Sequence, residues 1–138
     1  MAACTLHEIE TAIRRAWSLD TCDPVDVPEW SAANPARGQC GATALVLHDL
    51  LGGDLLRAEV RYADGSRQGH HYWNLLTGGV EIDLTAEQFG AGEVIQAPVV
   101  VARPDGPPRR CAEQYLRLRS LVLAELHVQP HPRRVVRR

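Results

Sequence analysis

The sequence predicts a single α+β domain, with helices toward both ends of the chain and antiparallel strands between them. Apolar residues follow helical spacing near the N-terminus, around residues 40–52 and again near the C-terminus, whereas residues 56–84 alternate between apolar and polar side chains. The 138 residues suit one domain and leave little room for a second. The order of helix, loop, helix, strands and helix, without an internal repeat, is that of an α+β fold.

The first helix is expected over residues 5–17. Thr5 and Glu8 have the spacing of a capping box, in which each side chain accepts a hydrogen bond from the other residue's backbone N–H. The apolar residues that then follow helical spacing are Leu6, Ile9, Ile13, Ala16 and Trp17. Residues 18–37 hold three prolines and several aspartates, which predicts an irregular loop over the surface.

A second helix is predicted to open at the segment Gly38-Gln39-Cys40-Gly41 and to end at Gly52-Gly53, because glycine favours the C-terminal cap of a helix. Its buried face consists of apolar residues at helical spacing: Ala42, Leu45, Val46 and Leu50. A final helix is expected over residues 110–126, with four large side chains on one face: Tyr115, Leu118, Val122 and Leu126.

The alternating region predicts a β-meander. Residues 56–62 and 68–76 read as two half-buried strands, joined by a turn at Asp64-Gly65. Residues 77–79, Thr-Gly-Gly, turn the chain into a third strand over residues 80–84.

The meander is followed by two weaker signals. Thr85 and Gln88 match a second capping box, which predicts a short helix near Phe89. Residues 94–102 read as one more strand, in which Pro98 either marks a sheet edge or interrupts the strand, since proline has no N–H to donate.

The composition is that of a globular protein, with 45% hydrophobic residues, 23% charged residues and a formal net charge of -2. This near-neutral charge argues against a nucleic-acid partner, and we expect the basic tail at residues 129–138 to be flexible rather than an RNA- or DNA-binding arm. No apolar run approaches the roughly 20 residues of a membrane helix. Residues 1–10 do not resemble a secretory signal, so we expect a cytoplasmic protein without a membrane partner.

Four cysteines are spread along the chain without a Cys-x-x-Cys pair: Cys4, Cys22, Cys40 and Cys111. In a cytoplasmic protein this spacing favours free thiols over disulfides or structural zinc. Cys40 stands out because it lies at the first turn of a predicted helix, where unpaired N–H groups and the positive helix end stabilise a thiolate. Position alone leaves a buried structural cysteine as an equal alternative.

Cys40 has candidate partners on the predicted hairpin. His71 and Trp73 share one strand face, whereas His70 lies on the other. An imidazole whose one nitrogen binds a carboxylate can present its other nitrogen to a thiol. Taken alone, each of these residues is better explained by a structural role than by catalysis.

The length of the second turn decides whether the hairpin supplies that carboxylate. If residues 77–79 form a three-residue loop, Trp73 pairs with Asp83, and His71 becomes a diagonal neighbour of Asp83 on the same face. A two-residue loop would instead place Asp83 opposite Asn74 and separate it from His71.

Three motifs therefore follow one another along the chain: Gly38-Gln39-Cys40, His71-Tyr72-Trp73 and Asp83-Leu84-Thr85. Their order resembles that of the transglutaminase-like and papain-like cysteine enzymes. The longer pattern, which also includes residues 43–46, 52–53 and 83–89, is similar to the small bacterial YunG-like family over most of residues 5–126.

The resemblance implies one transglutaminase-like α+β domain over residues 1–128. Its papain-like core would pack N-terminal helices on a small antiparallel sheet and add a C-terminal helix. In that core Cys40 would be the nucleophile, His71 the general base and then acid, and Asp83 the carboxylate that orients the imidazole.

Three further residues receive supporting roles from the same resemblance. Gln39 or Asn34 would assist an oxyanion hole, and Trp73 would pack beside the imidazole and shield it from water. Core packing is an equal explanation for Trp73.

The expected function is thiol-dependent acyl transfer, in which a thioester formed on Cys40 from an amide or ester is released to water or an amine. Hydrolase, deamidase and amide-forming transferase share this chemistry. The expected substrate is a small molecule, a peptide or a carrier-bound acyl group, with no cofactor. No pair of residues has the spacing of a structural zinc motif.

Two alternatives stay open. A non-catalytic binding domain would keep the fold without the chemistry, and a redox-sensing thiol at Cys40 would use another cysteine, such as Cys22, as its partner. The sequence predicts no oligomeric state.

Overall fold

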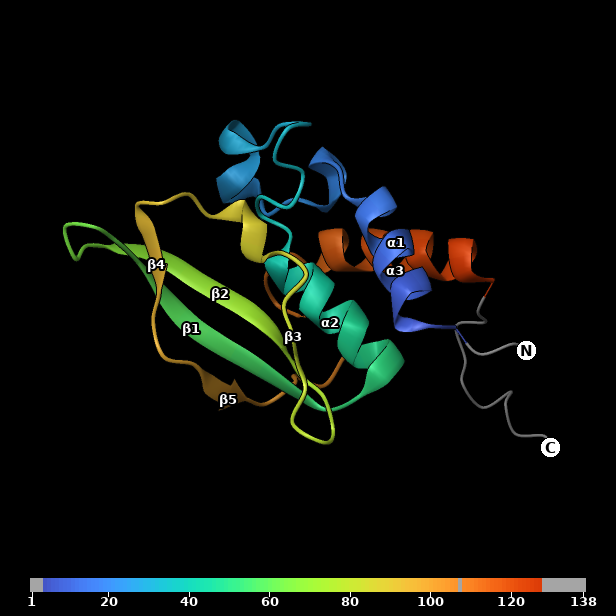
Figure 1. The fold of residues 1–138 in the computed structure, drawn as a ribbon. Helices are drawn as coiled ribbons and strands as arrows, with labels where there is room; N and C mark the ends of the chain where they lie inside the picture. Colours follow the sequence, from blue (N-terminus) through green and yellow to red (C-terminus); the bar gives the residue numbers. More distant parts are fainter. Residues whose placement is uncertain (1–3, 107, 128–138) are drawn as a thin grey trace.

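The computed structural model describes residues 4–106 and 108–127, which form three α-helices and five strands (Figure 1). The helices are α1 (Leu6–Ala16), α2 (Cys40–Leu51) and α3 (Ala112–Leu126). The strands are β1 (Asp54–Tyr62), β2 (Arg67–Leu75), β3 (Glu81–Ile82), β4 (Glu93–Ile95) and β5 (Val99–Val101). The predicted α+β class is confirmed, and the expected basic tail at residues 129–138 lies outside the described residues.

The capping box predicted for α1 is present. The backbone N–H of Thr5 donates to Glu8 Oε1 at 2.8 Å, and the N–H of Glu8 donates back to Thr5 Oγ1 at 3.0 Å. At the other end of the helix, the indole N–H of Trp17 donates to Thr43 Oγ1 at 3.0 Å. That buried bond ties the end of α1 to α2.

The sheet is antiparallel, in the order β3-β2-β1-β4, and β5 also pairs with β1. The single strand expected over residues 94–102 is interrupted near Pro98, one of the two outcomes predicted for that proline. Val60 pairs with Ile95, but Leu56 pairs with Val100, so the registers of β4 and β5 on β1 differ by one residue. Because proline cannot donate to the ladder, the chain breaks and shifts there.

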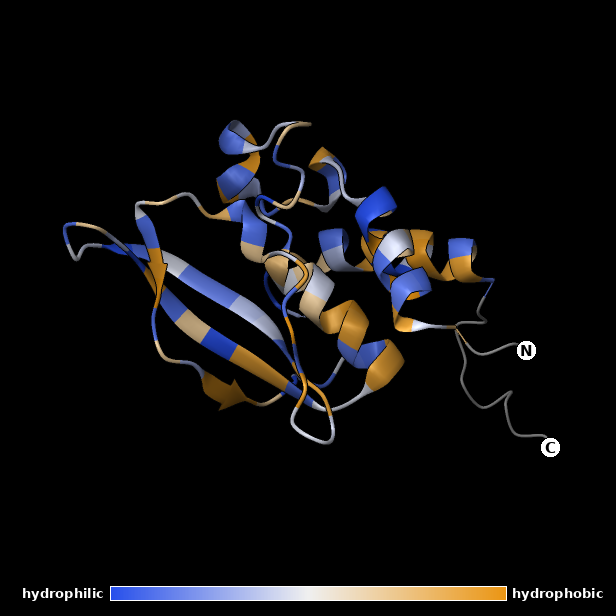
Figure 2. Ribbon diagram, viewed as in Figure 1, coloured by the Kyte–Doolittle hydropathy of each residue, from blue (hydrophilic) through white to orange (hydrophobic). Residues whose placement is uncertain are grey.

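The main core lies among the three helices and the sheet. It is built of residues from α1, α2, β3 and α3, including Ile13, Leu47, Ile82, Leu118 and Val122. A smaller cluster of Leu56, Ala58 and Trp73 lies on the sheet itself. Figure 2 shows the alternation of hydrophilic and hydrophobic residues along β1 that half-burial produces. Among the described helices, none has the length and apolar character needed to cross a membrane.

The loop between α1 and α2 is more ordered and more buried than its sequence predicts. It contains two 3₁₀ helices, η1 (Leu19–Thr21) and η2 (Pro24–Glu29), rather than only irregular chain. Its last residues before α2 are buried, including Arg37, which is 7% exposed. A charged side chain this deep must be paired, and its partners explain the order of the loop.

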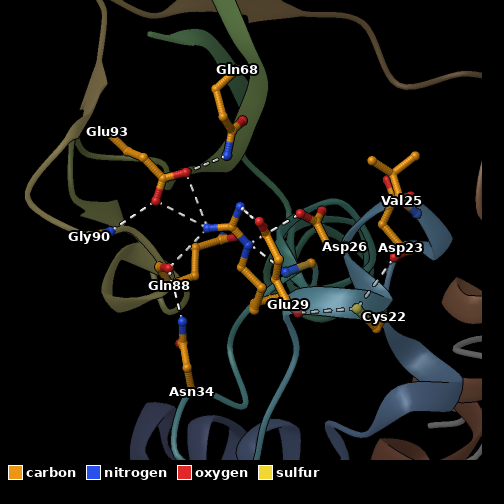
Figure 3. Close-up of polar contacts among 12 residues, drawn as sticks. Cys22, Asp23, Val25, Asp26, Glu29, Asn34, Gln68, Gln88, Gly90 and Glu93 are labelled. Atoms are coloured by element: carbon orange, nitrogen blue, oxygen red, sulfur yellow. Dashed lines mark hydrogen bonds and ion pairs between the residues drawn. The ribbon is translucent and has the colours of Figure 1, made fainter. Parts of the chain in front are cut away.

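Arg37 holds the loop in place through three carboxylates, which Figure 3 labels as Asp26, Glu29 and Glu93. Its guanidinium binds the carboxylates of Asp26 at 3.2 Å, Glu29 at 2.6 Å and Glu93 at 3.1 Å. Burial opposes the charge of Glu93, but hydrogen bonds from Gly90, Arg37 and Gln68 lower its pKa. The network therefore joins η2 to β4 across the end of the loop.

The second capping box, predicted from Thr85 and Gln88, is wrong. The Thr85 side chain caps no backbone N–H, and residues 86–88 form only a short 3₁₀ helix, η3 (Ala86–Gln88). The Gln88 side chain does not bond back to Thr85. Its Oε1 accepts from the backbone N–H of Gly38 at 3.2 Å, because the folded loop offers a nearby buried donor.

Replacing Arg37 by methionine is expected to lower the free energy of unfolding by about 3 kcal/mol, since it leaves the largely buried Asp26 and Glu93 without their shared cation. Urea denaturation at neutral pH measures this loss. Arg110→Gln is the matched control: its side chain pairs with Asp23 but is 65% exposed, so about 1 kcal/mol or less should be lost. Equal losses would contradict the role assigned to burial.

Candidate functional site

Cys40 is the first residue of α2 and is partly exposed. The helical ladder begins where the N–H of Thr43 donates to the carbonyl of Gln39 at 3.0 Å. The N–H groups of Cys40, Gly41 and Ala42 therefore precede the first helical hydrogen bond, and they suit an oxyanion beside the thiol.

Two glycines shape the chain around Cys40. Gly38 has a φ of +74°, and a side chain there would come within 2.5 Å of the sulfur of Cys22, so only glycine fits this turn. A Cβ at Gly41 would meet no atom within 4 Å. The space beside Cys40 on this side of the helix is therefore open to a ligand.

His71 lies on β2 with its side chain fully buried, and its Nε2 binds Asp83 Oδ2 at 2.7 Å. The loop over residues 77–79 has three residues, one of the two lengths considered from the sequence, and it brings them together. The N–H of Leu76 donates to the carbonyl of Val80 at 2.7 Å, and Asn74 pairs with Ile82. In this register Asp83, the residue after β3, is the diagonal neighbour of His71, as the sequence predicts for that loop length.

Aromatic rings hold the imidazole on two sides. The Trp73 ring stacks on it with centroids 5.1 Å apart, and the indole N–H donates to Glu81 at 2.8 Å. Phe89 meets the imidazole edge-on at 4.9 Å. The first contact follows from the strand face shared by His71 and Trp73. The contact of Phe89 with His71 was not predicted, because it depends on the direction of the chain directly after η3.

The Cys40 thiol acts on the charge of the imidazole. Burial disfavours the charged form of His71, but the hydrogen bond to Asp83 and the interactions with Cys40 and Asp83 outweigh it and raise the pKa of His71 to about 9. Nδ1 is buried and has no hydrogen-bond partner among the described residues. Because Asp83 occupies Nε2, Nδ1 is the nitrogen left for the thiol.

Asp83 therefore binds one nitrogen of His71, and the second nitrogen is the one available to the Cys40 thiol. The two ring nitrogens exchange the roles that they have in the serine-protease triad, where Nε2 faces the nucleophile and Nδ1 the carboxylate. An imidazolium beside a thiol at a helix start stabilises the thiolate, which is the reactive form of cysteine.

The two candidates for the oxyanion hole have other partners. Gln39 is fully buried; its Oε1 accepts from Thr21 at 2.7 Å, and its Nε2 donates to the carbonyl of Ser18 at 3.0 Å. Asn34 Nδ2 donates to the carbonyl of Gln88 at 3.1 Å. These bonds anchor the loop before α2, and an oxyanion role for either amide stays a prediction.

The other histidines near these elements bind elsewhere. His70 lies on the opposite face of β2 beside Arg67, and burial together with the charges of Arg67 and Arg57 lowers its pKa. His48, farther along α2, contacts Arg103 and the carbonyl of Gly53. In the described part of the chain, no three His, Cys, Asp or Glu side chains gather in an arrangement suited to a metal ion.

Comparisons with known proteins agree on one family. The family described as "YunG protein" matches residues 5–127. A relative from Bacillus subtilis (strain 168), named "Uncharacterized protein YunG", is 30% identical over 86 residues, which is 62% of this chain. The match spans 64% of that relative's length. No solved structure matches the chain significantly.

The raised pKa of His71 makes the stability of the fold depend on pH. The folded pKa, about 9, lies above the ordinary 6.5, so the stabilisation is complete below pH 6.5 and is lost as the pH rises through 9. The total change is on the order of 3 kcal/mol. Urea denaturation between these pH values should show this decline in the native protein.

His71→Gln should flatten that decline, because glutamine has no group that titrates in this range. Cys40→Ser should keep the part of the decline in the free energy of unfolding that comes from the bond between His71 and Asp83. A His71→Gln variant with the same slope as the native protein would show that another group causes the pH dependence.

Proposed function

The chain belongs to the YunG protein family, and we propose that it is a thiol-dependent acyl-transfer enzyme with Cys40, His71 and Asp83 as its triad. One observation carries the proposal: the fully buried imidazole binds a carboxylate at 2.7 Å, and its other nitrogen is buried without a hydrogen-bond partner among the described residues, which leaves it to serve the Cys40 thiol at the start of α2. A merely structural buried histidine would have both ring nitrogens bonded.

The first step forms the acyl-enzyme. The Cys40 thiolate attacks the carbonyl carbon of an amide or ester, and the N–H groups at the start of α2 stabilise the resulting oxyanion. As the oxyanion collapses, the bond to the leaving group breaks. The departing amine or alcohol takes the proton from His71 Nδ1, which leaves a thioester on Cys40 and a neutral imidazole.

The second step releases the acyl group. Neutral His71 takes a proton from water or an amine as it attacks the thioester, and the carbon–sulfur bond breaks. The products are a carboxylic acid or an amide, together with the original thiolate and imidazolium. Asp83 holds the ring and stabilises its charged form in both steps, without taking the proton itself.

Several features support the finer parts of this proposal. A cysteine at the start of a helix, a histidine on β2 and an aspartate directly after β3 support a transglutaminase-like, papain-like core. The open space at Gly41 favours a small molecule, a peptide end or a carrier-bound acyl group as the substrate. Free thiols at the described cysteines fit a reducing compartment, which favours the cytoplasm.

The redox alternative is less favoured. Cys22, the partner considered for it, is buried, and its S–H donates to the carbonyl of Arg37 at 3.3 Å. Burial and the charges of Asp26 and Asp23 raise its pKa to about 12. Such a thiol stays protonated at neutral pH and is a poor partner in disulfide exchange.

Alkylation of Cys40 by iodoacetamide tests whether the proposed pair exists. If His71 activates Cys40 as proposed, Cys40 should react faster with iodoacetamide at neutral pH than the other described cysteines do. His71→Ala should slow this reaction by about tenfold or more, whereas His70→Ala, on the other face of β2, should leave it unchanged. Peptide mass spectrometry follows each cysteine, with Cys22 and Cys111 as internal references. Equal effects of the two histidine variants would reject His71 as the partner.

Acylation of Cys40 tests the reaction itself. The activated ester p-nitrophenyl acetate should place an acetyl group on Cys40, seen by peptide mass spectrometry after acid quenching. Asp83→Asn should slow this acetylation by at least about tenfold, because an amide cannot stabilise the imidazolium. Fast alkylation without any acetyl-Cys40 would favour a non-catalytic binding domain. A lower melting temperature with unchanged acetylation would make Asp83 structural.

A further inference from the structure

Gln88 is a buried amide that touches the segment leading into α2. Its side chain is 4% exposed, and its Oε1 accepts a hydrogen bond from the backbone N–H of Gly38 at 3.2 Å. That donor fixes which end of the amide carries the oxygen, because only the oxygen can accept. Gly38 lies two residues before Cys40, in the turn that a side chain cannot enter.

The main chain of Gln88 binds the same segment. Its carbonyl accepts from Asn34 Nδ2 at 3.1 Å and from Arg37 Nη1 at 3.4 Å (Figure 3). Its own N–H donates to the carbonyl of Thr85 at 3.0 Å, which closes the turn of η3. Gln88 is thus bonded on both sides, to the loop before α2 and to the turn after β3.

The residues around Gln88 reach the other half of the site. Phe89, the next residue, places its ring against the imidazole of His71 at 4.9 Å. Asp83, which binds His71, lies two residues before Thr85. Residues 83–89 therefore carry the carboxylate, an aromatic neighbour of the imidazole and the clamp on Gly38 within one short stretch.

We propose that Gln88 is a positioning residue, whose amide oxygen holds the Gly38 turn and so sets Cys40 against His71 Nδ1. Loss of this bond leaves the Gly38 N–H buried and unpaired, and the turn moves to satisfy it. A displacement of about 1 Å at a reacting group is enough to slow a reaction by up to about a hundredfold. The inference rests on the proposed function only in calling the Cys40–His71 pair catalytic.

Two variants separate the acceptor oxygen from the rest of the side chain. Gln88→Met keeps the volume and removes both polar atoms, so we expect Cys40 alkylation at neutral pH to slow by about tenfold and to require higher pH. Gln88→Glu keeps an acceptor for Gly38 and should stay within about threefold of the native rate. Glu87→Gln, on the neighbouring exposed side chain that binds Arg14, is the matched control and should have no effect.

Each outcome has a distinct meaning. A folded Gln88→Met variant with the native rate and pH profile would overturn the positioning role and leave the proposed function intact. If Gln88→Glu is as slow as Gln88→Met, an acceptor oxygen at this position is not sufficient, and the positioning role of the oxygen is again overturned.

A second measurement needs no thiol reactivity. Cys40 raises the pKa of His71, so Cys40→Ser should lower that pKa, as followed by NMR of the imidazole. If Gln88 positions the pair, the same substitution made together with Gln88→Met should lower the pKa by much less. An undiminished shift in the double variant would reject the inference, even if Cys40 proves unreactive in the native protein.

Discussion

A single buried imidazole constrains the arrangement around it. His71 is excluded from water, so each of its ring nitrogens must find a partner inside the protein, or the fold loses free energy. Asp83 meets this requirement at Nε2, whereas Nδ1 has no hydrogen-bond partner among the described residues, and the proposed function assigns that nitrogen to the Cys40 thiol. The sheet register, the start of α2 and the path of the chain after β3 all have to agree for both partners to arrive.

The loop before α2 is also held in place by buried polar contacts. Arg37 lies just before the turn that leads into Cys40, and its buried guanidinium gathers carboxylates from η2 and β4. Gly38, next in the chain, donates to Gln88, which neighbours the ring packed on His71. Ion pairs thus hold Arg37, and a tight turn with a buried hydrogen bond holds Gly38, the next residue. Polar contacts, and not apolar packing alone, therefore position the segment that leads into the Cys40 thiol.

Local patterns predicted the parts of this arrangement that depend on short-range geometry. The capping box at Thr5 and the three-residue loop after Leu76 need only neighbouring residues, and the second of these aligns His71 with Asp83. The capping box predicted at Thr85 shows where local patterns fail. The Gln88 side chain accepts from the backbone N–H of Gly38, which is distant in sequence, instead of bonding back to Thr85. The partners of Arg37 and the ring contact of Phe89 depend on residues far apart in sequence, and no periodicity reveals them.

The loop over residues 77–79 has a consequence for how this protein can change during evolution. Surface loops usually tolerate insertions and deletions, because little depends on their length. Here a change of one residue would turn the side chains that follow to the opposite face of the sheet, and Asp83 would leave the imidazole. The number of residues in this loop is therefore constrained by the pairing of His71 with Asp83, and the positive φ angles of Gly78 and Gly79 also limit which side chains the loop accepts.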